Sequence, residues 1–218
     1  MNFFKSIVNL FYPNRCIFCD SIVQQQITVC DDCEKKLHEF RNHYPIFTRY
    51  GKIKCIAPFK YSGLPRQAVW FFKFRNAKSN AKPLSYYMIK TIKRHYRNIK
   101  FDYIAYVPST IMKKIIRGYS PVEELYKEIA PEFNLFEKKP IIIKVRRTKE
   151  QKNLLYVERL KNLKGAFKVS RKFDLTSKTI LLIDDVKTTG STIDTVAKAL
   201  FEAGAEQVYA AVFALVER

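Results

Sequence analysis

Short apolar runs alternate with amphipathic stretches over most of the chain after residue 100. Runs in which almost every position is apolar are typical of strands buried on both faces, as in a parallel sheet. Such strands are predicted at residues 103–107, 141–145, 179–183 and 207–215. Helices are predicted between them at residues 121–130 and 191–203, and Gly204 is placed to end the second helix. The alternation predicts β-α units and therefore an α/β fold.

The first hundred residues follow a different plan. Residues 52–61 indicate a strand, a short helix opens at Leu64, and residues 83–97 predict a second helix with one apolar face. Residues 42–51 contain a proline and a glycine, which indicates a linker. We therefore expect two units, a cysteine-containing module and an α/β domain, with the bounds 1–40 and 41–218.

The sequence holds no stretch of the roughly eighteen consecutive apolar residues that a membrane-spanning helix needs. The apolar stretch at residues 7–12 is too short for the core of a secretory signal. A cytoplasmic location is therefore expected.

The most informative motif is an apolar strand that ends in two acids. Residues 180–183 are apolar, and Asp184, Asp185, Val186 and Lys187 follow them. Open α/β sheets bind ligands at the carboxyl ends of their strands. Successive side chains of a strand point to opposite faces, so the two acids face the same way only if the strand is already turning. We expect one carboxylate on the diol of a sugar and its metal, with the other beside it.

A turn rich in hydroxyl groups comes directly after the acids. It consists of Thr188, Thr189, Gly190, Ser191 and Thr192 at the start of the predicted helix. The N–H groups at a helix N-terminus attract phosphate, and glycine lets the backbone approach a ligand closely. The alternative is a plain strand-turn-helix in which Ser191 or Thr192 is an N-cap. The double acid favours ligand binding.

Four of the five cysteines form two matched pairs. Cys16 and Cys19 are separated by two residues, as are Cys30 and Cys33, and ten residues lie between the pairs. This spacing suits a tetrahedral zinc site with four thiolates, which has no open position and is therefore structural. A redox dithiol is the alternative. Cys55 is predicted to be a buried thiol.

Positive charge is concentrated in one part of the chain. The net charge is +20, and residues 40–101 contain fifteen Lys or Arg and no Asp or Glu. The remaining residues are nearly balanced, with 25 basic and 20 acidic side chains. A stretch of 62 residues without a carboxylate indicates a surface that faces a polyanion.

Aromatic and basic residues alternate at residues 70–75, a mixture that proteins use to bind single-stranded nucleic acid. The helical spacing of Phe71 and Phe74 favours burial of both rings over stacking on bases. Charge is the firmer indication, because phosphate binding depends on charge more than on geometry. The candidate nucleic-acid contacts are Arg66, Lys73, Arg75, Lys78 and Lys82.

The apolar-acid-acid element followed by Thr-Gly resembles the signature of the type I phosphoribosyltransferases, which have a Rossmann-like fold. Further motifs resemble the ComF (competence protein F) family, and the resemblance covers nearly the whole chain, including the cysteine module. These motifs are Lys60-Tyr61-Ser62-Gly63 with Arg66 and Lys73-Phe74, Arg117-Gly118-Tyr119, Arg147-Thr148 with Gln151, Leu154, Arg159 and Asn162, and Gly165-Ala166-Phe167.

The resemblance implies a site for 5-phosphoribosyl 1-pyrophosphate (PRPP). Asp184 and Asp185 would take the ribose hydroxyls and magnesium, and residues 188–192 would hold the 5-phosphate. A loop at residues 108–118 would take the pyrophosphate, and residues 147–162 would close over the ligand. The candidates in these two segments are Lys113, Lys114, Arg117 and Gly118, and Arg147, Gln151 and Arg159. Ser120 stands where the family commonly has Asn or Asp, so no role is assigned to it.

Two functions follow, and the sequence leaves both open. A ComF-type protein would bind PRPP and single-stranded DNA during natural transformation, with a competence helicase as a possible partner. A metabolic phosphoribosyltransferase, which is a glycosyltransferase, would instead transfer phosphoribose to a nucleobase or another nitrogenous acceptor. A third possibility is a regulator that uses the sugar as a signal for nucleic-acid binding.

Overall fold

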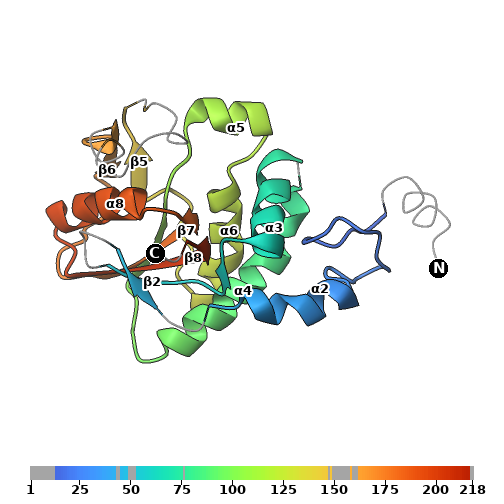
Figure 1. Ribbon diagram of the computed structural model, residues 1–218. Helices are drawn as coiled ribbons and strands as arrows, with labels where there is room; N and C mark the ends of the chain where they lie inside the picture. The colour runs from blue at the N-terminus through green and yellow to red at the C-terminus, as the bar shows by residue number, and fades with distance from the viewer. Residues whose placement is uncertain are drawn as a thin grey trace.

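A computed structural model describes the chain and is built around one central sheet (Figure 1). It describes residues 13–42, 45–48, 53–75, 77–146, 148, 158 and 162–216. The strand order is β1-β2-β8-β7-β4, with β3 also paired to β8. All pairings are parallel except that of β1 with β2. The strands are β1 (Ile46–Phe47), β2 (Lys54–Ile56), β3 (Phe59–Lys60), β4 (Tyr103–Tyr106), β7 (Thr179–Lys187) and β8 (Gln207–Leu215).

Helices cover both faces of this sheet and make a three-layer α/β fold. One face carries α3 (Gly63–Phe74), α4 (Ala81–His95) and α6 (Pro121–Ile129), and the other carries α8 (Ser191–Glu202). Strand β7 explains the division, because its side chains alternate between two buried clusters. Leu181 and Ile183 belong to the cluster under α3, α4 and α6, and Ile180 and Leu182 belong to the cluster under α8.

Some of the predicted strands match the structure and one does not. The predictions at residues 103–107 and 207–215 are confirmed by β4 and β8. The prediction that residues 141–145 join the parallel sheet is wrong. Instead, β5 (Ile142–Lys144) pairs antiparallel with β6 (Phe167–Val169) in a separate two-stranded sheet beside α8. Ile143 and Val145 are 39% and 48% exposed there, so the run is apolar without being buried on both faces.

The predicted helices are present with small shifts of their ends. The short helix is α3, and the helix predicted at residues 83–97 is α4, with Pro83 in its first turn, where a missing N–H is tolerated. The strand predicted at residues 52–61 is divided into β2 and β3. In the predicted linker, Ile46 and Phe47 form β1, and residues 43–44 and 49–51 lie outside the described residues. Short 3-10 helices complete the list of elements, namely η1 (Leu37–Phe40), η2 (Lys78–Asn80) and η3 (Ala130–Phe133).

The cysteine module shares its core with the α/β domain. It contains α2 (Asp31–Lys36), and Phe18 is fully buried. The Phe18 ring packs edge-on against Phe59 of β3 and Tyr87 of α4, with centroid distances of 6.0 and 6.1 Å. The module therefore gains part of its buried apolar surface from the larger domain. The boundary at residue 40 stays a prediction.

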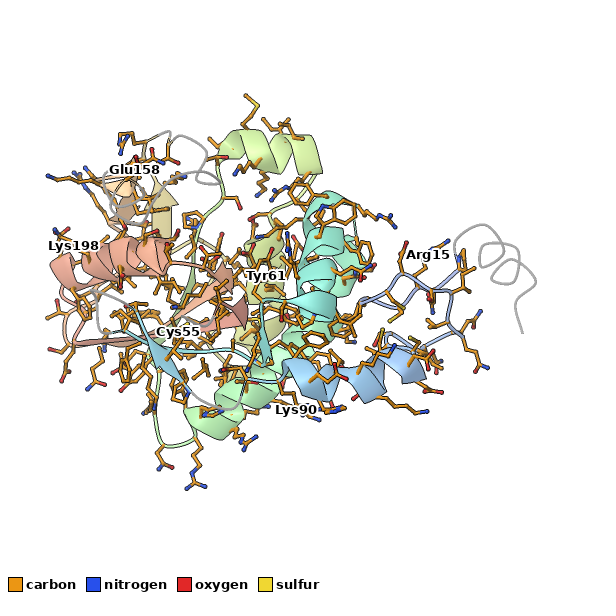
Figure 2. All side chains as sticks on the ribbon, in the orientation of Figure 1. Arg15, Cys55, Tyr61, Lys90, Glu158 and Lys198 are labelled. Atoms are coloured by element: carbon orange, nitrogen blue, oxygen red, sulfur yellow. The ribbon has the colours of Figure 1, made fainter. Side chains whose placement is uncertain are left out.

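Cys55 on β2 is fully buried in the sheet, as predicted, and burial raises the pKa of its thiol to about 12 (Figure 2).

Among the described residues, none of the helices has both the length and the apolar character to span a bilayer.

Candidate functional site

Strand β7 extends beyond its neighbour β4, which places its last residues at the carboxyl edge of the sheet. The β4 pairing ends at Tyr106 and Ile183, whereas the β8 pairing continues to Lys187 and Leu215. The sequence predicted that the strand ends at Ile183. It continues through Asp184 and Asp185 because β8 still supplies a partner on one side. Both acids are thus held on a strand rather than on a loop, at the edge where parallel sheets bind ligands.

The two acids lie on opposite faces of β7, as strand geometry requires. Asp184 is 9% exposed and lines a pocket together with the turn before α8. Asp185 points to the α3 face, where its Oδ1 lies 2.7 Å from Nζ of Lys73. The backbone N–H of Asp185 also donates a hydrogen bond to Oδ1 of Asp184 over 2.9 Å.

The pKa of the buried Asp184 carboxyl is well above its usual range. Burial, and then the negative Asp185 beside it, raise the pKa of Asp184 to about 8, although the Asp185 N–H and the Lys73 cation act in the opposite direction. A carboxylic acid with such a pKa is protonated at neutral pH and can be ionised by a ligand that brings a cation.

The turn before α8 forms the rest of the pocket. Gly190 is the N-cap of α8 with φ +86° and has no side chain to cap the helix, while the Thr189 hydroxyl accepts a hydrogen bond from the Ser191 N–H over 3.4 Å. The hydroxyls of Thr189 and Ser191 lie 3.0 Å apart, and both residues are buried. The pocket is lined by Asp184, Val186, Lys187, Thr188, Thr189, Gly190, Ser191, Thr192 and Ile193. A helix N-terminus that begins at a glycine and is surrounded by hydroxyl groups is suited to an anion.

Lys187 lines the pocket, and Thr48 packs beside the turn at Gly190. Lys187 follows the predicted end of the strand at Ile183, but in the structure it is the last residue of β7 and is 7% exposed. Thr48 follows β1, is 2% exposed, and would contact a Cβ at position 190 at 3.4 Å. Its hydroxyl accepts a hydrogen bond from the Ile53 N–H over 3.1 Å. Thr48 was missed because it stands in the predicted linker, far from the motif in sequence.

The predicted pyrophosphate loop is largely a helix. Residues 111–117 form α5 (Ile111–Arg117), so the expectation of a loop at 108–118 is wrong for these positions. Thr110 caps the helix by accepting from the Lys113 N–H, and Gly118 ends it in the left-handed conformation with φ +75°. Lys114 is paired with Glu123 over 2.9 Å, which favours a surface role for this cation.

Arg117 and Tyr119, which flank Gly118, both contact α3. The Arg117 guanidinium lies over the Phe74 ring at 4.9 Å from its centroid, and the Tyr119 hydroxyl donates to the Phe72 carbonyl. Helix α3 therefore borders this segment as well as Asp185.

The third predicted segment lies largely outside the described residues. Arg147, Gln151 and Arg159 are among the residues that are not described. The nearby Lys144 of β5 is described and was not predicted. Its Nζ donates to the Thr148 hydroxyl over 2.9 Å. Burial, followed by the neighbouring Lys113 and Arg146 cations, lowers the pKa of Lys144 to about 8. Cations from α5 and β5 therefore lie close enough to influence one another.

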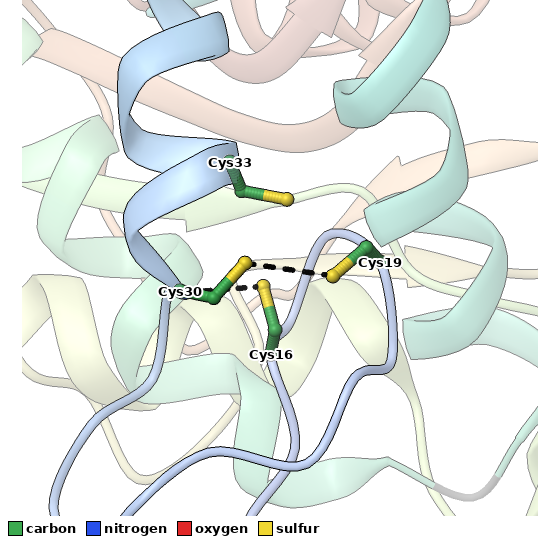
Figure 3. A group of neighbouring side chains, drawn as sticks. All are labelled: Cys16, Cys19, Cys30 and Cys33. Atoms are coloured by element: carbon green, nitrogen blue, oxygen red, sulfur yellow. Dashed lines mark hydrogen bonds between the residues drawn. The ribbon is translucent and has the colours of Figure 1, made fainter.

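The four predicted zinc ligands converge at the amino end of the chain (Figure 3). The sulfur atoms of Cys16, Cys19, Cys30 and Cys33 all lie within 4.8 Å of one another. Zinc–sulfur bonds of about 2.3 Å in a tetrahedron place the sulfurs about 3.8 Å apart. The observed separation of Cys19 Sγ and Cys30 Sγ is 3.7 Å, which fits zinc and is too long for a disulfide. The four-cysteine ribbon therefore supports a structural zinc.

The predicted nucleic-acid contacts are divided between paired and solvent-facing cations. Lys73 is paired with Asp185, Arg75 with Asp20 of the cysteine module, and Lys78 with Glu124 of α6. Arg66 and Lys82 are exposed and form no ion pair with any other residue that the structure describes.

The aromatic residues of α3 are only partly as expected. Phe71 is 6% exposed, which confirms its predicted burial. The predicted burial of Phe74 is wrong, because Phe74 is 53% exposed and Trp70 is 48% exposed. The end of α3 turns these two rings outward, with their centroids 6.1 Å apart. They form an exposed aromatic surface beside basic residues.

Comparisons with known proteins match both units of the chain. A double zinc ribbon domain model matches residues 7–65, and a phosphoribosyl transferase domain model matches residues 118–217. Competence protein F from Haemophilus influenzae is 28% identical over 141 residues, which are 63% of this chain and 62% of that protein. The chain thus spans less than two thirds of the length of this relative. A solved structure described as the allosteric regulatory enzyme of purine biosynthesis is 18% identical, with a TM-score of 0.38, over 62% of this chain and 25% of that chain.

Proposed function

We propose that this chain is a ComF-type protein that binds PRPP and single-stranded nucleic acid, since it is similar to Competence protein F and matches a phosphoribosyl transferase domain and a double zinc ribbon domain. The sugar site lies at the end of β7 and the start of α8. The nucleic-acid surface lies over α3 and α4. The biological role that fits these two ligands is handling of DNA in the cytoplasm during natural transformation, with a competence helicase as a partner.

The main support for the sugar site is that a buried acid and a phosphate-binding turn line the same pocket. Asp184 lies in the same pocket as residues 188–192. The backbone N–H groups of the first turn of α8 hold the 5-phosphate, and the Thr189 and Ser191 hydroxyls add donors. Asp184 accepts a hydrogen bond from a ribose hydroxyl in the pocket, and Asp185, the next residue at the end of the strand, accepts from the neighbouring hydroxyl.

The cations around the pocket complete the recognition of a highly charged sugar. Lys113 and Arg117 of α5 supply charge for the pyrophosphate, and Lys187 supplies charge inside the pocket. Magnesium arrives with the ligand, and the acidic pair fits it because this ion prefers carboxylate oxygens. In a transfer reaction, these residues would orient the sugar and stabilise the charge that leaves with pyrophosphate.

The nucleic-acid surface is supported by charge and exposed rings. Residues 40–101 contain fifteen cations and no carboxylate, and Arg66, Lys82 and Trp70 on α3 and α4 are exposed. Cations bind the phosphates of a strand, and exposed aromatic rings stack on its bases. Three of the five candidate cations already pair with acids of the protein, so the surface is smaller than the sequence predicted.

Calorimetry with PRPP and magnesium tests the sugar site directly. Binding of wild-type protein, lost on replacement of the turn, supports the proposal. An absence of heat from folded protein overturns it. Release of pyrophosphate in the presence of common nucleobases would instead identify a metabolic phosphoribosyltransferase, because a DNA-handling protein has no need of that acceptor.

A further inference from the structure

Helix α3 touches the sugar site at one of its acids. Lys73 Nζ lies 2.7 Å from Oδ1 of Asp185, and the two side chains are 22% and 15% exposed. Ion pairs with this degree of shielding interact more strongly than those on an open surface. The Asp185 carboxylate therefore already has a cationic partner, supplied by the helix that borders the proposed nucleic-acid surface.

The Lys73–Asp185 ion pair engages one group that each of the two ligands needs. A sugar with its magnesium requires the Asp185 oxygens, and a cation held 2.7 Å from one of these oxygens repels an incoming metal ion. A nucleic-acid strand on α3 in turn requires the Lys73 ammonium. Each ligand binds best after the pair has separated.

Lys73 lies at the partly buried end of a ridge of α3 whose other two residues are exposed. Arg66, Trp70 and Lys73 are spaced by four and three residues, which places them on one face of the helix. Arg66 is exposed and Trp70 is 48% exposed. A strand that lies along this ridge reaches Lys73 after passing the other two side chains.

A second contact links α3 to the segment proposed to hold pyrophosphate. Arg117 lies over the Phe74 ring, with 4.9 Å between the guanidinium and the ring centroid. A pyrophosphate group would attract Arg117 away from this ring, because an ionic hydrogen bond is stronger than an exposed cation–π contact.

We propose that the Lys73–Asp185 pair couples the two ligands, so that PRPP with magnesium raises the affinity of the protein for single-stranded nucleic acid, and the reverse. This rests on the proposed function. Whichever ligand binds first breaks the ion pair, which costs free energy. The second ligand then binds without that cost. The coupling is positive and must be equal in both directions. We expect an increase in affinity of about fivefold or more, the lower range of measured couplings.

The experiment measures both affinities in one set of proteins. Anisotropy of a fluorescent oligothymidylate gives nucleic-acid affinity with and without saturating PRPP and magnesium, at constant ionic strength. Calorimetry gives PRPP affinity with and without saturating oligothymidylate. Magnesium with inorganic pyrophosphate serves as the control ligand, because it brings similar charge without a ribose.

Two variants separate coupling from a general loss of charge. Lys73→Met removes the pair, and its coupling factor should fall to about one. Arg66→Met removes a cation from the same ridge without touching Asp185. It should weaken nucleic-acid binding while preserving the wild-type coupling factor.

The outcomes distinguish this inference from the function on which it rests. Coupling in the wild type and Arg66→Met proteins, equal in both directions and lost in Lys73→Met, supports it. If the wild type binds both ligands independently, or if PRPP weakens nucleic-acid binding, the coupling is refuted and the proposed function stands. Retention of coupling in Lys73→Met also refutes it. A wild-type protein that binds no PRPP overturns both proposals.

Discussion

The backbone N–H of Asp185 donates a hydrogen bond to the carboxylate of Asp184 over 2.9 Å, although the two side chains lie on opposite faces of β7. This bond favours the ionised form of Asp184. Burial and the negative Asp185 outweigh it, and the pKa of Asp184 is raised to about 8. The acid that lines the pocket is therefore protonated at neutral pH until a ligand changes its surroundings.

Binding of PRPP with magnesium should release a proton near pH 7. The ligand needs the ionised carboxylate of Asp184, whose pKa of about 8 lies above that pH. The binding enthalpy should therefore vary with the ionisation enthalpy of the buffer, and affinity should rise between about pH 6 and pH 8. Asp184→Asn should remove both effects. A binding enthalpy that is independent of the buffer would contradict an Asp184 that is protonated in the free protein.

The same pKa affects stability in a defined direction. The folded protein holds the Asp184 proton up to about pH 8, whereas the unfolded chain releases it near the ordinary value of 3.8. The folded state thus binds more protons between these values, and stability falls as pH rises through this window. Urea unfolding should show a smaller fall for Asp184→Asn than for the wild type. An equal pH dependence in the two proteins would argue against the raised pKa.

Asp185→Asn should weaken PRPP binding and leave the fold intact. The amide keeps the shape of the side chain but loses the charge that attracts the metal. Loss of a hydrogen bond to a charged group costs about 1.5–3 kcal/mol, or roughly 10- to 150-fold in affinity. Calorimetry measures the affinity, and circular dichroism checks the fold. Global unfolding would mean that Asp185 is a structural partner of Lys73 and not a ligand contact.

Gly190→Ala should reduce both stability and PRPP binding. Position 190 has φ +86°, and a left-handed conformation costs a residue with a Cβ about 1–2 kcal/mol. The added methyl also enters the pocket wall beside Thr48. Gly165→Ala is the matched control, because its φ is +66° and an added Cβ meets nothing within 4 Å. The control should lose similar stability but keep PRPP affinity. Equal affinities in the two variants would exclude the turn as the phosphate site.

The sequence was sufficient to predict the elements that are determined by residues close together in the chain. The apolar run, the acids and the Thr-Gly turn are consecutive in the chain, so β7 as far as Ile183 and the start of α8 followed from pattern alone. The cysteine site followed in the same way, because ligand spacing within each pair fixes the geometry.

Contacts between distant segments could not be read from the pattern. Lys73 and Asp185 are more than a hundred residues apart, and only the packing of α3 on the sheet brings them together. Residues 141–145 have the apolar composition of a central strand, but their partner is β6. The amino-acid composition of a strand is a poor guide to its burial when a short sheet packs on one side only.

Cys16→Ser should release zinc and loosen the amino module without abolishing PRPP binding. Three thiolates leave the tetrahedral site incomplete, and a module of about forty residues depends on its metal for folding. Metal analysis should show loss of the bound zinc, and limited proteolysis should cut near the cysteines. Cys55→Ser, the matched control on β2, should retain zinc because Cys55 lies outside the four-sulfur cluster. Full zinc content in Cys16→Ser would contradict the assigned ligand set.

Nucleic-acid affinity should fall steeply as salt rises, because cation–phosphate contacts release counterions. Arg66→Met should lower the slope of log affinity against log salt by about 0.7, the value for one contact with a single strand. Lys198→Met is the control, since this exposed lysine lies on α8, on the other side of the sheet from α3 (Figure 2). Its slope should equal that of the wild type. A wild-type affinity that is the same at low and moderate salt would refute the basic surface. An equal effect of the two substitutions would show that the charge acts through the whole molecule and not through the α3 ridge.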